Sequence, residues 1–229
     1  MVRLDARPEP LDLDPRRVAM IVIDAQNDFA SPGGMFESAG IDISGIAAAA
    51  QATRPVLDAV RAAGIPVVYL NMEHAPDLSD AGPPEGPHRV KHRPLALGAT
   101  VDAPDGSPSR VLVRETWNTR NVPDLAPEPG DIVVSKHRYS GFFETELDDV
   151  LRGLGVTQLL VAGCTTSVCV ESTVRDATFR DYTCVVLEDC TSEPLGTHDA
   201  SLKVIETLFG WVSNTAAVLE ALAHQTDSV

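Results

Sequence analysis

Three residues that could carry out chemistry stand where apolar, strand-like runs of the chain end. Asp24 directly follows the run Val18–Ile23, and Lys136 and Cys169 follow similar runs further along. In an open α/β sheet, ligands bind outside the carboxyl ends of the strands. The three side chains can therefore meet in one pocket although they lie far apart in sequence. An acid, a cation and a thiol in one cleft predict covalent hydrolysis by an activated cysteine.

Each of the four cysteines has to be weighed as the nucleophile. Cys184 lies within a strand pattern and is interpreted as a small buried hydrophobic residue. Cys164 and Cys190 stand at strand ends, so position alone leaves them as alternatives. Cys169 is favoured because Thr165–Ser167 offers N-caps for a helix whose first turn would hold the thiol. There, unpaired N–H groups and the helix dipole favour the thiolate.

Asp24 and Lys136 each have a structural alternative. Asp24 could hydrogen-bond within the turn after the first strand, and Lys136 could be a solvated lysine. In a cleft, the lysine charge would favour the ionised forms of a neighbouring carboxyl and thiol. Asp24 would then take the thiol proton and return it to a leaving amine. Together the three residues predict a coherent catalytic site.

The composition is typical of a soluble globular protein. The chain has 229 residues, of which 44% are hydrophobic, enough for one large core or two small ones. Its net charge of −15 argues against nucleic acid or an anionic membrane as a partner. We interpret the charge as a solvated surface, so it predicts no cationic substrate.

Targeting signals and disulfides are not expected. The first residues contain no apolar segment typical of a secretory signal. No run approaches the ~20 apolar residues that a membrane-spanning helix needs. The four cysteines are therefore predicted to be reduced thiols. These observations predict a cytoplasmic protein.

Strand-like and helix-like segments alternate, which is typical of a parallel sheet covered by helices. Residues 1–229 are predicted to form one domain, a three-layer α/β/α sandwich with a mostly parallel central sheet. The predicted strands are 18–23, 65–70, 111–113, 132–135, 156–163 and 183–187. The predicted helices are 43–63, 145–153 with Thr145 as N-cap, 168–180, 200–209 and 216–223. Pro55 predicts a kink or break in the first helix. The apolar side of 200–209 is expected to hold Leu202, Ile205, Leu208 and Phe209.

Residues 72–110 contain many Pro, Gly, Asp and His residues and no sustained period. Irregular segments of this length inside compact domains are usually functional or mobile. We interpret this segment as a lid on the substrate side of the sheet, with a plain surface excursion as the alternative.

Metal and nucleotide sites find little support in the sequence. His88 and His92 could share a helical face, but prolines flank them. The chain has no H-E-x-x-H or C-x-x-C pattern, which argues against a dedicated zinc site. The glycine patterns of phosphate loops and dinucleotide-binding folds are also missing. We therefore expect no metal and no cofactor.

These motifs resemble those of the isochorismatase-like cysteine hydrolases, and the resemblance covers nearly the whole chain. The residues that carry it are 23–29 (IDAQNDF), the turn 32–34 (PGG), Lys136, 163–170 (GCTTSVCV), 173–177 (TVRDA) and 187–189 (LED). By this resemblance Asp24, Lys136 and Cys169 take the catalytic positions, which decides among the cysteines.

The resemblance implies further details. It implies a cis peptide just before Thr165, with the backbone N–H groups of Thr165 and Cys169 turned inward as an oxyanion hole. Metal-dependent members carry aspartate and paired histidines after the second strand, whereas this chain has NMEH at 71–74, so no metal is implied. A homo-oligomer is also implied, a dimer or a tetramer in which a neighbouring chain could complete the pocket.

Two ureide-cleaving branches resemble different parts of the chain. Residues 138–143 (RYSGFF), 170–173 (VEST) and 205–213 (IETLFGWVS) are similar to the ureidoacrylate amidohydrolases. Residues 74–80 (HAPDLSD), inside the predicted lid, are more similar to the biuret hydrolases. His137 departs from the proline of the first branch. The resemblance implies ureide chemistry and leaves the substrate open.

We expect a small ureide or amide to be hydrolysed at a C–N bond through an acyl-enzyme on Cys169. The alternatives are another small amide or lactam, such as an N-carbamoyl amino acid, an antibiotic amide or a nicotinamide-like compound, and a non-catalytic family member. The candidate substrate-binding residues are Gln26, Asn27, Phe29, Asn71, His74, Tyr139 and Phe142. For each of them, shaping a turn or packing in the core is the structural alternative.

Overall fold

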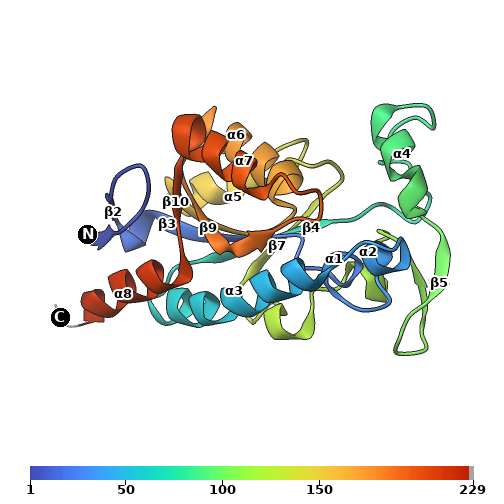
Figure 1. Cartoon of the computed structure of the whole chain (residues 1–229), viewed down its shortest axis with the longest axis horizontal. Helices are drawn as coiled ribbons and strands as arrows, with labels where there is room; N and C mark the ends of the chain where they lie inside the picture. Colours follow the sequence, from blue (N-terminus) through green and yellow to red (C-terminus); the bar gives the residue numbers. More distant parts are fainter. Residues whose placement is uncertain (227–229) are drawn as a thin grey trace.

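The computed structural model of the chain describes residues 1–226, with side chains to residue 223. Its centre is a six-stranded parallel sheet in the order β10-β9-β8-β3-β4-β7 (Figure 1). The strands are β3 (Val18–Ile23), β4 (Val67–Met72), β7 (Ile132–Lys136), β8 (Gln158–Cys164), β9 (Thr183–Ser192) and β10 (Trp211–Ser213). Every residue of β3 and β4 is buried, as expected for central strands covered on both faces.

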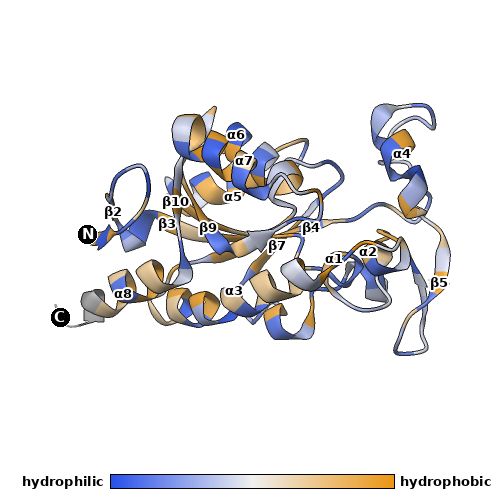
Figure 2. Cartoon of the chain, viewed as in Figure 1, coloured by the Kyte–Doolittle hydropathy of each residue, from blue (hydrophilic) through white to orange (hydrophobic). Residues whose placement is uncertain are grey.

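Helices cover both faces of this sheet, which confirms the predicted three layers (Figure 1). α3 (Ser44–Ala62) and α8 (Thr215–Thr226) cover one face. α5 (Leu147–Gly153), α6 (Glu171–Thr178) and α7 (His198–Val204) cover the other. Figure 2 shows apolar residues concentrated on the strands between these two helix layers. The chain therefore builds one hydrophobic cluster on each side of the sheet.

The alternation of side chains along β3 connects these two clusters. Met20 and Val22 join the cluster under α3, whereas Ile21 and Ile23 join the cluster under α6 and α7. Successive strand residues point to opposite faces, so a shift of one residue would exchange the two sets. Packing on both faces of the sheet therefore fixes the register of β3, and with it the position of Asp24 at the end of that strand.

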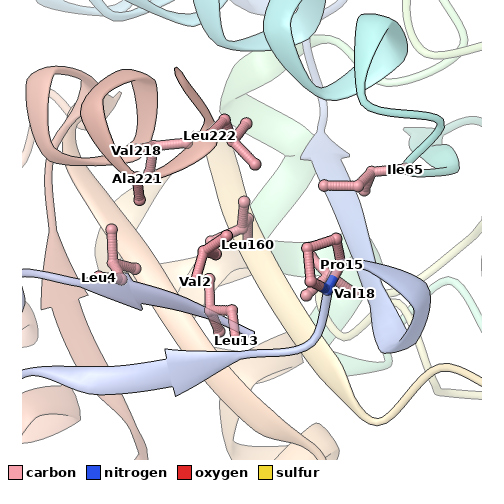
Figure 3. Close-up of a pocket in the computed structure, with 10 residues that line it drawn as sticks. All are labelled: Val2, Leu4, Leu13, Pro15, Val18, Ile65, Leu160, Val218, Ala221 and Leu222. Carbon is pink, nitrogen blue, oxygen red and sulfur yellow. The ribbon is translucent and has the colours of Figure 1, made fainter. Parts of the chain in front are cut away.

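A small ribbon and the last helix close the end of the sheet that lies away from the strand tips. β1 (Val2–Leu4) pairs antiparallel with β2 (Leu11–Leu13). Figure 3 shows their apolar side chains facing those of α8 around a narrow pocket lined by Val2, Leu4, Leu13, Pro15, Val18, Ile65, Leu160, Val218, Ala221 and Leu222. Arg7 ties this ribbon to the body through Glu188 at 2.8 Å and Glu206 at 3.1 Å. The N-terminus and α8, the last described helix, lie at this end (Figure 1).

Several predicted element bounds need correction. Residues 111–113 form a turn rather than a strand, because Leu112 takes a left-handed φ of +52°. α3 runs through Pro55 as one continuous helix, so the predicted break is wrong. β9 continues to Ser192, five residues past the predicted end, and reaches the rim of the site. The helix after β8 begins with one turn of π-helix at Thr166–Val170, before α6.

Two side-chain predictions also differ from the structure. Thr145 is not the N-cap of α5; that position belongs to Glu146, although the Thr145 hydroxyl accepts a hydrogen bond from the Leu147 N–H at 3.3 Å. Residues 200–209 form α7 and a π-helical turn at Ile205–Phe209. Leu208 is 69% exposed, because the wider turn rotates it away from the buried side that holds Leu202 and Ile205.

The segment 72–110 has defined elements of its own. It holds α4 (Pro87–His92), a 3₁₀ turn at Arg93–Leu95 and the hairpin of β5 (Thr100–Asp102) and β6 (Pro108–Arg110). Figure 1 shows α4 and β5 at the end of the molecule opposite the N-terminus and α8, near the short helices α1 (Asn27–Ala30) and α2 (Met35–Ser38). None of the described helices is long and apolar enough to cross a membrane.

Candidate active site

Asp24, Lys136 and Cys169 come together at the carboxyl ends of the strands. Asp24 directly follows β3, Lys136 ends β7, and Cys169 lies in the π-helical turn after β8. The Lys136 Nζ lies 2.8 Å from the Asp24 Oδ2, and neither side chain is exposed. The Cys169 thiol lies close enough to both for their charges to shift its pKa. The sheet thus brings together three groups that the sequence keeps apart.

Asp24 is held from several directions. Its backbone takes a φ of +52°, a region that non-glycine residues seldom occupy and aspartate tolerates better than most. The Asp24 N–H donates to the Leu70 carbonyl at 2.8 Å, and the Met72 N–H donates to the Asp24 Oδ1 at 3.0 Å. Burial raises the pKa of the Asp24 carboxyl, although the charge of Lys136 acts in the opposite direction. A raised pKa suits a group that must take a proton from a thiol.

Lys136 remains a cation in this buried position. Burial alone lowers the pKa of a lysine, but attraction to Asp24 and Cys169 outweighs it and the pKa of Lys136 is raised. Its Nζ also donates to the Arg138 carbonyl at 3.3 Å. The ammonium is therefore fixed beside the carboxylate and the thiol.

The Cys169 thiol is held in its neutral form, which corrects the expectation of a helix-stabilised thiolate. Burial raises the pKa of Cys169 to about 12, and the charge of Asp24 adds to the rise while Lys136 opposes it. The expected capping does not occur: Thr165 occupies the N-cap position without a side-chain cap, and the Thr166 hydroxyl pairs with Thr191 and His198 instead. A neutral thiol beside Asp24 is the form from which that carboxylate can remove a proton.

The other three cysteines lack this environment. The Cys164 Sγ donates to the Asp24 backbone carbonyl at 3.2 Å, not to its carboxylate. Cys184 is fully buried in the cluster under α6, and the Cys190 Sγ lies 3.1 Å from the Thr215 hydroxyl. The charges of Asp24 and Lys136 act on the pKa of Cys164 as well as on that of Cys169. Among the four thiols, all of which the structure describes, Cys169 is the one that also lines a cavity large enough for a small ligand.

A cavity of about 290 Å³ opens onto Cys169. Its walls are Phe29, Met35, Phe36, Ile41, Met72, Lys91, His92, Pro94, Leu95, Tyr139, Thr165, Val168, Cys169, Pro194 and Leu195. Thr165 follows the Cys164–Thr165 bond, which is cis, as the sequence resemblance implies. The cavity brings the strand ends, α1–α2, α4 and the loop after β9 around one space.

Phe29 and Tyr139 are the predicted substrate-binding residues that line this cavity. Gln26 and Asn27 do not line it. Gln26 is fully buried, donating to the Met72 and Thr119 carbonyls at 3.1 and 2.9 Å while its Oε1 accepts from the Met72 N–H. Asn27 donates to the Trp117 carbonyl at 2.8 Å. Both side chains fix the turn after β3 instead of facing a ligand.

Asn71, His74 and Phe142 do not line the cavity either. Asn71 donates to the Asn121 side chain at 2.8 Å. His74 is fully buried between Asp80 and His88, with ring-nitrogen distances of 3.1 and 3.3 Å. Phe142 packs in the cluster under α6. Asn71 and His74 lie at or just after the end of β4, which gave the correct region of the fold but not the direction of their side chains.

Sequence reasoning missed most of the cavity wall. Met35, Phe36 and Ile41 come from α2 and the residues after it, and Pro194 and Leu195 from the loop before α7. Lys91 and His92 come from α4. These segments have no long periodic pattern, so no sequence signal marked them apart from the general interpretation of 72–110 as a lid.

The histidines of α4 form a cluster that the sequence did not reveal. His74, His88 and His92 stack or pair with one another, with ring centroids 5.3 Å apart for the first pair and 4.2 Å for the second. Within the described part of the chain, no group of three or more His, Cys, Asp and Glu side chains is arranged to hold a metal ion. The cluster is therefore a hydrogen-bonded one.

Sequence comparison finds close relatives over nearly the full chain. A model of the isochorismatase domain matches residues 18–217. The ureidoacrylate amidohydrolase RutB of Methylobacterium radiotolerans is 45% identical over 223 residues, covering 96% of this chain and 85% of the relative. RutB of Caulobacter vibrioides is 45% identical over 217 residues, covering 94% of this chain and 90% of the relative.

Solved structures agree with the fold. A cysteine hydrolase from Pseudomonas syringae pv. phaseolicola matches with a TM-score of 0.77 and 29% identity, covering 93% of this chain and 96% of that one. An isochorismatase family protein from Desulfovibrio vulgaris matches with a TM-score of 0.73 and 29% identity, covering 91% and 99% of the two chains.

Proposed function

Because this chain belongs to the isochorismatase family, we propose that it is a cysteine-dependent amidohydrolase that cleaves a C–N bond of a small ureido compound. The observation that carries the proposal is the buried Asp24–Lys136 pair beside the Cys169 thiol, which lines a cavity. Relatives that are 45% identical to this chain over nearly its full length are ureidoacrylate amidohydrolases.

In the first half of the reaction, Asp24 takes the thiol proton as the Cys169 Sγ attacks the ureido carbonyl carbon. The S–C bond forms and the carbonyl π electrons move to oxygen. We assign the backbone N–H groups of Thr165 and Cys169 to that oxyanion, because both residues line the cavity beside the thiol. The C–N bond then breaks, and the leaving amine departs with the proton that Asp24 held.

In the second half, Asp24 accepts a proton from water as the water oxygen attacks the acyl-enzyme carbonyl. The C–S bond breaks and Asp24 returns the proton to the Cys169 sulfur. When the acyl group is carbamoyl, the carbamate released decomposes to CO₂ and ammonia. Lys136 stays protonated throughout and stabilises whichever neighbour carries the negative charge.

Ammonia release from a substrate panel tests this function. The panel is ureidoacrylate, biuret, an N-carbamoyl amino acid and nicotinamide, each with the wild-type protein and with Cys169→Ala. Turnover of a ureide that disappears in Cys169→Ala is the expected result. Turnover of nicotinamide alone, or of a ureide by Cys169→Ala, would overturn the proposal. The ratio of the turnover rates for biuret and ureidoacrylate decides between the two ureide branches.

The domain organisation and assembly complete the proposal. We propose that residues 1–229 form one domain and that the protein is a cytoplasmic homo-oligomer, a dimer or a tetramer. The support is the one six-stranded central sheet that the described residues build and the sequence resemblance stated above. Light scattering coupled to gel filtration tests the assembly: a monomer at micromolar concentration would contradict it.

A further inference from the structure

Two adjacent residues of α4 face the same cavity as the Cys169 thiol. Lys91 and His92 end this short helix, which stands outside the sheet (Figure 1). Most of the cavity wall is apolar, and Lys91 is the one side chain of that wall with a full charge. A cation at the rim and an imidazole on the wall are groups that can recognise a polar ligand.

Hydrogen bonds fix the tautomers of the histidines behind this wall. The Asp80 carboxylate also accepts from the Ala75 N–H at 2.9 Å and from Arg114 at 2.8 Å, and its pKa is lowered although burial acts against this. The His74 Nδ1 therefore donates to Asp80 at 3.1 Å. Burial lowers the pKa of His74 to about 4, so the ring is neutral and its Nε2 is an acceptor.

His88 continues this sequence of hydrogen bonds. Its Nε2 lies 3.3 Å from the His74 Nε2, so it must be the donor of that pair. Burial lowers the pKa of His88 to about 3, which keeps this ring neutral as well. Its Nδ1 is then a buried acceptor without a partner within the described side chains. The His88 backbone carbonyl accepts from the His92 Nδ1 at 2.9 Å.

His92 is consequently oriented as an acceptor toward the cavity. Its Nδ1 carries the proton that the His88 carbonyl accepts, and burial lowers the pKa of the ring, so His92 is neutral. In that tautomer the Nε2 holds a lone pair. The Tyr139 ring lies 5.8 Å from the His92 ring, centroid to centroid, and confines it from the strand side. A ligand that donates an N–H suits this nitrogen.

We propose that His92 and Lys91 determine specificity for a ureido acid, with the His92 Nε2 accepting a hydrogen bond from a ureido N–H and Lys91 binding the carboxylate. This inference rests on the proposed ureide hydrolysis and adds the residues that choose among ureides. The oxyanion donors and Lys136 lie at the thiol end, so the carbonyl is directed there and the N–H groups remain for an acceptor. A neutral compound such as biuret offers no anion to Lys91.

Matched substrates test the role of Lys91. The ratio of kcat/KM for 3-ureidopropionate to that for its neutral amide, 3-ureidopropionamide, isolates the contribution of the carboxylate. We expect wild type to prefer the acid and Lys91→Gln to lower the ratio about tenfold, the size of one hydrogen bond to a charged group. Arg93→Gln is the matched control, because Arg93 is an exposed cation two residues away that pairs loosely with Glu85 and does not line the cavity. An unchanged ratio in Lys91→Gln, or an equal fall in Arg93→Gln, would overturn the assignment.

Two substitutions test the role of His92. His92→Phe keeps a flat ring without an acceptor, and His92→Gln keeps an acceptor on a flexible chain. We expect KM for 3-ureidopropionate to rise about tenfold in His92→Phe and less in His92→Gln, with circular dichroism unchanged. Equal effects of both substitutions, or a lower kcat with KM unchanged, would remove His92 from substrate recognition.

Failure of the specificity proposal can be told apart from failure of the proposed function. If wild type hydrolyses both ureides without preferring the acid, the function stands and the role of Lys91 is wrong. If no ureide is hydrolysed, the function is wrong, and calorimetric binding of 3-ureidopropionate and 3-ureidopropionamide to Cys169→Ala decides the rest. If 3-ureidopropionate binds more tightly than its amide and Lys91→Gln abolishes that difference, the recognition site stands. Equal binding of the two compounds would overturn it.

Discussion

The Lys136 ammonium and the Asp24 carboxylate lie 2.8 Å apart with both side chains fully buried. Taking two charges out of water costs free energy that their attraction repays only when geometry and hydrogen bonds are good. Here the Met72 N–H donates a further hydrogen bond to the carboxylate. Burial is the largest cause of the raised pKa of the neighbouring Cys169 thiol, and the two members of the pair act on that pKa in opposite directions.

Asp24→Asn should separate thiol ionisation from turnover. The Asp24 charge and hydrogen bond raise the pKa of Cys169, so removing them lowers that pKa from about 12. Alkylation by iodoacetamide at pH 8–9 should become faster, while ammonia release is lost because no base remains. Rates of both reactions on the same preparation check this. An unchanged alkylation rate would mean that Asp24 does not act on the thiol, and a slower one would mean that its charge does not raise the thiol pKa.

Lys136→Met should change alkylation in the other direction. The Lys136 charge lowers the pKa of the Cys169 thiol, so its removal raises the pKa further and slows alkylation at a given pH. The pH–rate profile of hydrolysis should shift to higher pH. Lys203→Met is the control, since Lys203 is 71% exposed and pairs with Glu206 away from the site. A profile that matches wild type would remove Lys136 from the mechanism.

The buried histidines predict loss of stability in acid. The pKa values of His74 and His88 are lowered from 6.5 to about 4 and about 3, so the unfolded chain takes up protons that the folded chain does not. Above pH 6.5 both rings are neutral in the folded and the unfolded chain, and the free energy of unfolding has its full value. It decreases as the pH falls from 6.5 toward 3. Each ring should cost about 1 kcal/mol between pH 7 and 5, allowing for partial solvent access. Urea unfolding of wild type and His88→Gln at both pH values checks this: the variant should lose less stability, and an equal loss would contradict the prediction.

Gly163→Ala should disrupt the contact between β8 and β3. A methyl group there would collide with the backbone of Ile23, directly before Asp24, and the φ of +117° strains any other residue. We expect a loss of about 3 kcal/mol or more in the free energy of unfolding. Gly153→Ala, on α5 with open space around it, should be neutral or stabilising by up to about 1 kcal/mol. Equal urea midpoints for the two variants would show that the contact is not rigid.

The strand ends were predictable because continuous apolar runs identify buried parallel strands. Asp24, Lys136 and Cys169 each follow such a run, and one rule about strand ends places all three in a common site. The sequence resemblance then chose Cys169 among three thiols at strand ends. The fold class and the location of the chemistry could therefore be predicted before any coordinates.

Side-chain direction and protonation could not be predicted in this way. His74 and Phe29 both follow strands, yet His74 turns into a buried cluster and Phe29 into the cavity. The thiol pKa depends on burial, which position in a helical turn does not reveal. Lys91 and His92 reach the cavity only through the tertiary path of 72–110, so no local pattern identified them.

The placement of α4 outside the sheet has a consequence for divergence. The groups assigned to bond breaking stand on strand ends that both hydrophobic clusters hold in register, whereas Lys91 and His92 stand on one short helix between two irregular connections. Replacing that helix would move no strand. Proteins with this architecture can therefore keep their hydrolytic residues in place and change their substrate specificity through substitutions in this one short helix.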